Sequence, residues 1–121
     1  MYNVIFYEDK NGRREIEEHL INLKEKADAG NKDARIRFNK IVAYIDTLEE
    51  LGTRVGEPVT KHLDGEIWEL RPLRNRILYA YYENNTFILL HQFTKTTKKT
   101  PKREIEQAIS NLKDYRERHG E

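Results

Sequence analysis

The fold is decided by the stretch EIWELRPLRNRILYAYYENN, residues 66–85. Its apolar and aromatic side chains are typical of β-strands, and the segment Pro72–Asn75 divides it into two of them. The same stretch holds Trp68 and three tyrosines. The dividing turn is accompanied by three arginines, Arg71, Arg74 and Arg76. The centre of the chain therefore combines strand-forming aromatic residues with concentrated positive charge.

Short strands continue on both sides of this stretch. We expect four in succession: Val59–Leu63, Ile67–Arg71, Arg76–Tyr82 and Thr86–Phe93. The turns between them include Asp64-Gly65 and Asn84-Asn85, and such residue pairs tolerate the positive φ that hairpin turns require. Successive strands joined by tight turns predict an antiparallel meander.

Two amphipathic helices are expected before the meander. The apolar residues of segments 16–27 and 34–48 recur at helical spacing. Gly30 and Gly52 are the expected ends of these helices. The β-branched and aromatic run Val4–Tyr7 predicts a strand in front of the first helix.

A last helix is expected after the meander, with Thr100 as its N-cap and Pro101 at the first helical position. Its apolar stripe is formed by Ile105, Ile109 and Leu112. The element order predicts an α+β fold: a small antiparallel (mixed-edge) twisted sheet with two N-terminal helices packed on one face and a C-terminal helix. We expect the helices to cover one face of the sheet and to leave the other available for a ligand.

The length of 121 residues favours a single domain, residues 1–121. The absence of cysteine excludes disulfides and thiolate chemistry. No apolar run is long enough to span a bilayer and no secretory signal is visible, so we expect a cytoplasmic protein. The sequence has no phosphate-binding glycine loop, paired-histidine metal motif or nucleophile elbow, so we expect no cofactor and no metal.

The net charge is only +1, but the charge is unevenly distributed. Residues 1–60 carry 10 basic and 12 acidic side chains, whereas the segment from Arg71 to Arg103 carries eight basic residues and one acid, Glu83. A local excess of this kind creates a field that attracts a polyanion to one place. Taken alone, the charge pattern is explained equally well by a solvated surface.

The basic residues are expected to gather at one end of the meander. The segment TKTTKKTPKRE, residues 94–104, follows the last strand and can lie beside the arginine-bearing turn. Arginine binds phosphate with two hydrogen bonds, and tyrosine stacks on bases, as single-stranded RNA recognition requires. Tyr82 is the first stacking candidate because it shares strand parity with Arg76. The candidate RNA- or ribosome-binding residues are Lys61, Arg74, Tyr82, His91, Lys98 and Lys99.

The order of elements and the stretches WELRPLRNRILYAYY and FTKTTKKTPKREIEQA resemble the HigB branch of the RelE/ParE toxin superfamily, the group of phage-derived Gp49-like proteins. The resemblance is strongest over residues 59–110 and weakest over the first two helices. It implies the toxin of a type II toxin–antitoxin system, which cleaves messenger RNA in the ribosomal A site. It also implies a HigA-like helix-turn-helix antitoxin as partner, no membrane, and contact with DNA only through the antitoxin complex.

The resemblance implies catalytic residues as well. Arg76 falls at the central-strand catalytic arginine of the family, and Arg71 and Lys95 fall at phosphate-contacting positions. Clustered cations lower the pKa of a neighbouring lysine, so Lys95 can act as a general base. His62 and His91 remain alternative bases. We expect Arg76 to be exposed, so that its removal abolishes cleavage and leaves stability nearly unchanged.

Two other functions fit the same sequence. A ParE-like toxin on a related scaffold would target gyrase and would not need the arginine–lysine set. A non-catalytic RNA- or ribosome-binding module would use the same charges and aromatic residues without turnover.

Overall fold

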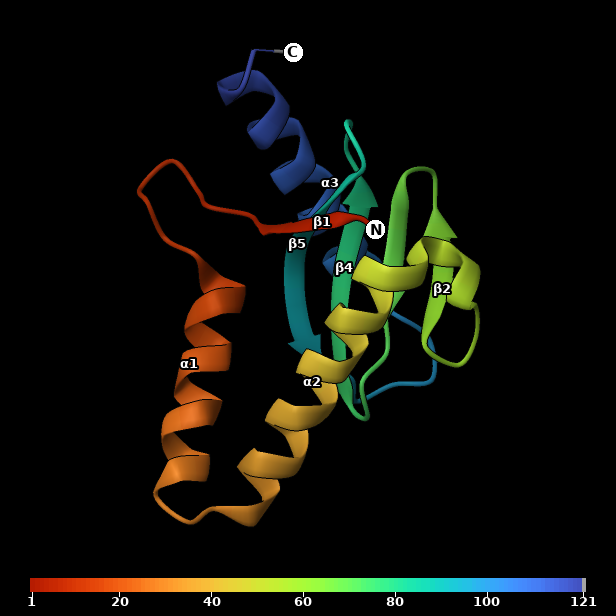
Figure 1. The fold of residues 1–121 in the computed structure, drawn as a ribbon. Coiled ribbons are helices and arrows are strands. Elements are labelled where there is room, and N and C mark those ends of the chain that lie inside the picture. The colour runs from red at the N-terminus through yellow and green to blue at the C-terminus, as the bar shows by residue number, and fades with distance from the viewer. Residues whose placement is uncertain (121) are drawn as a thin grey trace.

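The computed structural model describes residues 1–120, which form a five-stranded sheet packed between helices (Figure 1). The helices are α1 (Glu15–Asp28), α2 (Lys32–Leu51), the short 3-10 helix η1 (Gly52–Val55) and α3 (Lys102–Arg118). The strands are β1 (Asn3–Phe6), β2 (Thr60–Asp64), β3 (Ile67–Leu70), β4 (Asn75–Tyr81) and β5 (Thr86–Thr94). Every expected element is present, and the strand ends differ from expectation by at most one residue. Glu121, the last residue of the predicted domain, lies outside the described residues.

The sheet has the strand order β1-β5-β4-β3-β2. Strands β2 to β5 form the expected antiparallel meander, since each pairs with the next along the chain. Strand β1 pairs in parallel with β5, with Asn3 opposite Thr86 and Phe6 opposite Leu89. The α+β fold with a mixed edge is therefore confirmed.

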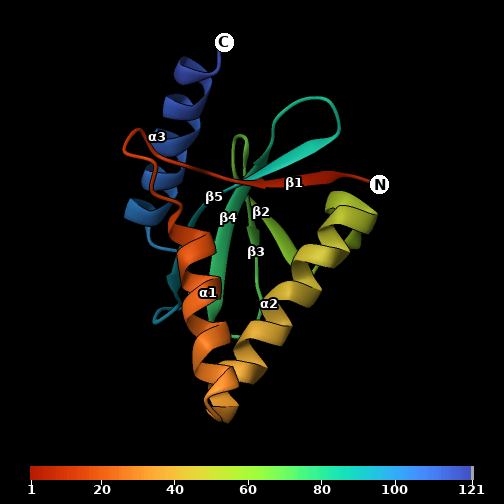
Figure 2. The same cartoon turned by 60° about the vertical axis from the view of Figure 1, so that its left-hand side comes forward.

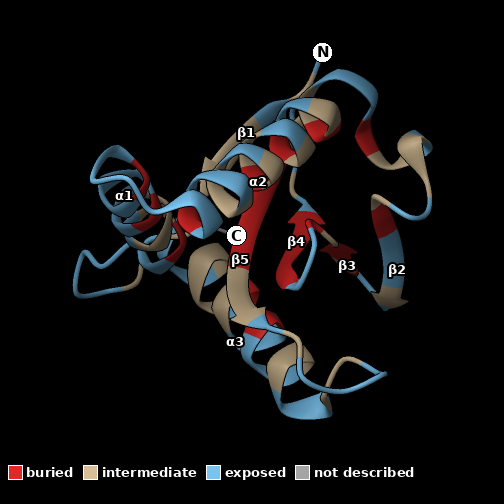
Figure 3. Ribbon diagram, turned by 90° about the horizontal axis from the view of Figure 1, so that it is seen from below, coloured by how far each residue is buried: buried red, intermediate tan, exposed pale blue. Residues whose placement is uncertain are grey.

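The two faces of the sheet are covered by different helices. Figure 3 shows α1 and α2 on one side of the strands and α3 on the other. The first face packs on α1 and α2 through Ile77, Tyr79 and Leu89. The second face packs on Ala108 and Leu112 of α3 through Leu78, Ala80, Ile88 and Leu90. The expectation of a face left uncovered was therefore wrong for the centre of the sheet, because these apolar side chains require a helix over them.

Helices α1 and α2 form a V that is closed at the connection between them (Figure 2). Gly30 ends the first arm with a φ of 100°, a conformation that glycine adopts without steric cost. Asn31 starts the second arm, because its side-chain oxygen accepts a hydrogen bond of 2.9 Å from the backbone nitrogen of Ala34. No helix within residues 1–120 is both long and apolar enough to cross a bilayer.

The start of α3 differs from the prediction. Pro101, not Thr100, occupies the N-cap position, and no side chain caps the helix there. The hydroxyl of Thr100 donates instead to Oε2 of Glu69, which is buried in the sheet. A buried carboxylate needs a hydrogen-bond donor more than the helix terminus does, because water can reach the exposed backbone N–H groups.

Candidate functional site

A cationic hollow opens at the end of the sheet that α3 leaves uncovered. It has a volume of about 250 Å³. Its walls come from β2, β3, the segment after β5 and the first turn of α3. We call it the basic pocket, and its lining residues are Lys61, His62, Leu63, Glu69, Arg71, Lys95, Lys98, Lys99, Thr100 and Ile105.

The strand register explains why these residues meet. Lys61 of β2 lies directly opposite Glu69 of β3, so both project from the same face. Arg71 follows Glu69 by two residues and therefore points to that face as well. The backbone nitrogen of Lys95 donates to the carbonyl of Arg74 at 2.7 Å, which holds the end of β5 beside the turn between β3 and β4. Tight turns thus bring residues more than thirty positions apart into one pocket.

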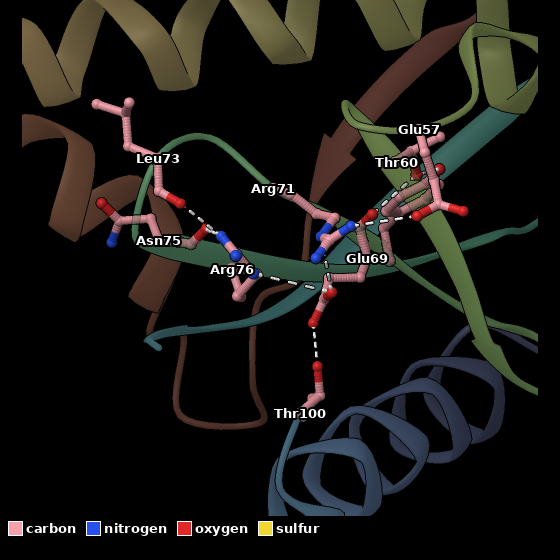
Figure 4. A network of polar contacts seen from close by, with 9 residues as sticks. Glu57, Thr60, Glu69, Arg71, Leu73, Asn75, Arg76 and Thr100 are labelled. Carbon is pink, nitrogen blue, oxygen red and sulfur yellow. Dashed lines mark hydrogen bonds and ion pairs between the residues drawn. The ribbon is translucent and has the colours of Figure 1, made fainter. Parts of the chain in front are cut away.

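Arg76 lies in the floor behind this pocket and is only 7% exposed. Its Nη1 donates to the carbonyl oxygens of Leu73 at 2.7 Å and Asn75 at 2.8 Å (Figure 4). Leu73 has a φ of 58°, an uncommon conformation for leucine, in the turn that directs its carbonyl to Arg76. The expectation that Arg76 is exposed was therefore wrong, because backbone carbonyls and a buried acid provide the partners that its charge needs inside the protein.

That buried acid is Glu69, which the sequence analysis missed. Its side chain is 3% exposed and lies between two guanidinium groups: its Oε1 is 3.5 Å from Nε of Arg71 and 3.8 Å from Nε of Arg76. Thr100 donates to the other carboxylate oxygen. The available signal was strand parity, since Glu69 shares a face of β3 with Arg71. Glu69 fixes the positions of both arginines by charge and geometry.

Both arginines keep donor capacity. The Nε groups of Arg71 and Arg76 are buried and have no hydrogen-bond partner among residues 1–120, because their distances to Glu69 are those of ion pairs. A buried N–H without a partner costs about 1–3 kcal/mol. The nearby charge of Glu69 offsets part of this cost, because its carboxylate lies within ion-pair distance of both groups.

The positive charges also affect Lys95. Desolvation lowers its pKa below the ordinary lysine value, and the charges of Arg76 and Arg71 lower it further. Burial likewise lowers the pKa of Arg76, with Glu69 acting in the opposite direction, but a guanidinium remains protonated at any physiological pH. The pocket therefore combines permanent cations with one lysine that loses its proton more readily than usual.

Most of the predicted site residues come together here. The pocket is lined by five of them, Lys61, Arg71, Lys95, Lys98 and Lys99, and Arg76 lies directly behind it. Arg74 is exposed in the adjoining turn. His62, an alternative base, also lines the pocket; its Nε2 is 2.8 Å from the carbonyl of Gly65 and its ring packs edge-on against Trp68.

Tyr82 and His91 lie elsewhere. Tyr82 has the expected parity, but it follows Arg76 by six residues, about 20 Å along a strand, and it packs edge-on against Tyr115. His91 is 2.8 Å from Oε1 of Glu104 and lines a different hollow. Parity specifies the face of a sheet but not the position along a strand, so neither residue joins the basic pocket.

The element order, the mixed sheet and the helix on each face define a RelE-like fold. A family model described as phage-derived protein Gp49-like (DUF891) matches residues 15–113, so the chain belongs to this family, which is a family of RelE/HigB-like toxins. The match includes every residue that lines the basic pocket. No curated protein matches the chain. Membership indicates a toxin-like protein with an antitoxin-type partner.

Lys98 and Lys99 of the pocket provide a test of whether this surface binds a single-stranded polyanion such as RNA. Each phosphate contact of a single strand contributes about −0.7 to the slope of log K against log salt. Lys98→Ala and Lys99→Ala should each make this slope shallower by about one contact in a titration with single-stranded RNA. Lys24→Ala is the matched control, since Lys24 pairs with Asp28 on α1. An equal change in the Lys24 variant would mean that binding is spread over the whole surface.

Proposed function

We propose that this protein is a ribosome-dependent messenger RNA endoribonuclease and acts as the toxin of a type II toxin–antitoxin system. One observation carries the proposal: Arg71 and four lysines, Lys61, Lys95, Lys98 and Lys99, line one open pocket, and the buried Arg76 lies directly behind it beside Glu69. The pocket holds one carboxylate, Glu69, and that carboxylate already lies between Arg71 and Arg76. The charges of the four lysines are therefore left for an anion from outside, as a site for a phosphate group requires.

The reaction requires little from the protein besides position and charge. The 2′-hydroxyl of the RNA attacks the adjacent phosphorus, a bond from the 2′-oxygen to phosphorus forms, and the bond from phosphorus to the 5′-oxygen breaks. A base removes the 2′-proton, and the departing 5′-oxygen takes up a proton. The products are a 2′,3′-cyclic phosphate and a 5′-hydroxyl. Arg71 and Arg76 stabilise the additional negative charge on the phosphoryl oxygens during this step.

Lys95 is the proposed general base, because its lowered pKa increases the fraction that is neutral. Glu69 is a positioning residue: it holds the two guanidinium groups while its own oxygens are occupied by Arg71, Arg76 and Thr100. The ribosome would supply what the pocket lacks, namely a message held in the geometry for in-line attack.

The proposed partner is a HigA-like helix-turn-helix antitoxin, which inhibits the toxin and represses the operon that encodes both. The toxin itself would meet DNA only through that complex. A small helix-turn-helix reading frame beside the toxin gene is the arrangement that this proposal expects.

The deciding experiment is to add the purified protein to translating ribosomes and to map the ends of the messages. The proposal expects new 5′-hydroxyl ends within the codon in the A site and no cleavage of the same RNA without ribosomes. Intact messages together with inhibited gyrase would instead indicate a ParE-like toxin. Intact messages with ribosome binding would indicate a non-catalytic module.

The pH dependence of cleavage tests the role of Lys95. A base acts when it is neutral, so the single-turnover rate should rise about tenfold per pH unit below the lowered pKa of Lys95 and level off above it. Lys95→Arg keeps the charge but does not lose its proton, so it should cut slowly and without this slope. The measurement uses programmed ribosomes between about pH 6 and 9. A variant that retains the wild-type slope would show that another group is the base.

A further inference from the structure

A second hollow adjoins the basic pocket along α3. It has a volume of about 350 Å³, within the range of sites that hold small ligands, and lies between α3 and the turn that joins β2 to β3. We call it the α3 hollow. Its lining residues are Asp64, Gly65, Glu66, Ile67, Ile109, Leu112, Lys113 and Arg116.

The two hollows lie next to each other along both walls. On β2 the basic pocket ends at Leu63 and the α3 hollow begins at Asp64. On α3 the basic pocket ends at Ile105 and the α3 hollow begins at Ile109, four residues or about 6 Å further along the helix. That distance is on the order of the step between neighbouring nucleotides in an extended strand.

The α3 hollow differs from the basic pocket in its chemistry. Ile67, Ile109 and Leu112 provide apolar walls, and Ile109 is 45% exposed although it belongs to the apolar stripe of its helix. Charged groups surround these walls. Arg116 donates to both carboxylate oxygens of Glu66, at 2.8 and 2.6 Å, and both residues line the hollow.

We propose that the α3 hollow binds the base of a nucleotide next to the scissile phosphate. The inference rests on the proposed function, since it extends the RNA path of the basic pocket. A base has apolar faces and a polar edge, and this hollow offers apolar walls within a polar rim. Asp64 and Lys113 provide an acceptor and a donor for the edge of the base. The backbone of the same strand remains beside Lys61, Lys98 and Lys99.

Synthetic messages with a single abasic nucleotide test this proposal. Ribosomes are programmed with messages in which the abasic position moves one nucleotide at a time across the cleavage site. With wild-type protein, cleavage should fall about tenfold or more when the missing base is the one that the hollow binds, and change little at more distant positions.

Ile109→Trp should fill the hollow. This variant should cut the complete message as slowly as wild type cuts the message that lacks the base bound by the hollow. The position of the abasic nucleotide should then have no effect on the rate. Ile109→Ala, which removes part of the wall without filling the space, should reduce the sensitivity to the missing base. Ile36→Trp is the matched control: Ile36 is 59% exposed on α2, across the sheet from α3, and this variant should behave as wild type. Equal thermal midpoints of all four proteins exclude misfolding as the cause.

The outcomes separate the inference from the function on which it rests. If wild type cleaves but Ile109→Trp keeps the wild-type rate and abasic profile, the base-binding proposal is wrong and the proposed function stands. If Ile109→Trp changes only neutralisation by the antitoxin, the hollow is a protein-docking surface and the proposal is again wrong. If wild type cleaves no message, the proposed function fails and the base-binding site fails with it.

Discussion

Replacing Arg76 by alanine is expected to reduce message cleavage about 10²–10³-fold and to lower the free energy of unfolding by about 1–3 kcal/mol. The loss of activity follows from removing a cation that stabilises the charge of the transition state. The loss of stability follows from burial, because the variant leaves Glu69 with one guanidinium neighbour instead of two and frees the carbonyl oxygens of Leu73 and Asn75.

A second substitution separates these two effects. Glu69→Gln replaces the buried carboxylate by a neutral amide, which does not need the positive charge of Arg76. The amide oxygen can still accept the hydrogen bond from Thr100. The double variant Arg76→Ala/Glu69→Gln should therefore recover part of the lost thermal stability without recovering cleavage. Urea titration and single-turnover cleavage on programmed ribosomes measure the two quantities. Cleavage at the wild-type rate by Arg76→Ala would show that the site has been placed wrongly.

Expression of the protein without its antitoxin is expected to stop growth and translation, and co-expression of the antitoxin should restore both. The physical reason is catalytic turnover, since one toxin molecule can cut many messages. Pulse labelling of new protein, together with growth curves, measures the effect.

The double variant provides the matched control for toxicity, because it is expected to fold but not to cleave. Cells that express it should continue to grow. Growth arrest by this variant would mean that toxicity arises from binding alone. Normal growth of cells that contain abundant folded wild-type protein would count against a toxin.

The meander and the helices could be predicted because their signals are local. Asp64-Gly65 and Asn84-Asn85 specify turns, and three of these residues, Gly65, Asn84 and Asn85, have the positive φ that such turns need. The parallel pairing of β1 with β5 could not be derived in this way, since about eighty residues separate the partners and no turn specifies their register. The resemblance supplied the overall arrangement at that point.

The high density of basic residues between Arg71 and Arg103 indicated which charged residues form the site. It did not indicate that Arg76 is buried. An arginine beside a turn has the same sequence pattern whether it faces water or a buried carboxylate. The sequence therefore predicts a surface residue at Arg76, whereas in the structure Arg76 lies beside the buried carboxylate of Glu69. Thr100 shows the same limit. Its sequence position suits a helix N-cap, but its hydroxyl donates a hydrogen bond to the buried carboxylate of Glu69 on β3.

The meander that assembles the basic pocket also sets when the pocket can exist during synthesis. Its walls need β2 and β3, the segment that follows β5, and the start of α3, so Lys95 and Thr100 must have left the ribosome before the floor and mouth are complete. Domains fold as units when their sequence has emerged. A nascent chain that has not yet released these residues therefore carries no assembled pocket, whatever the pocket binds.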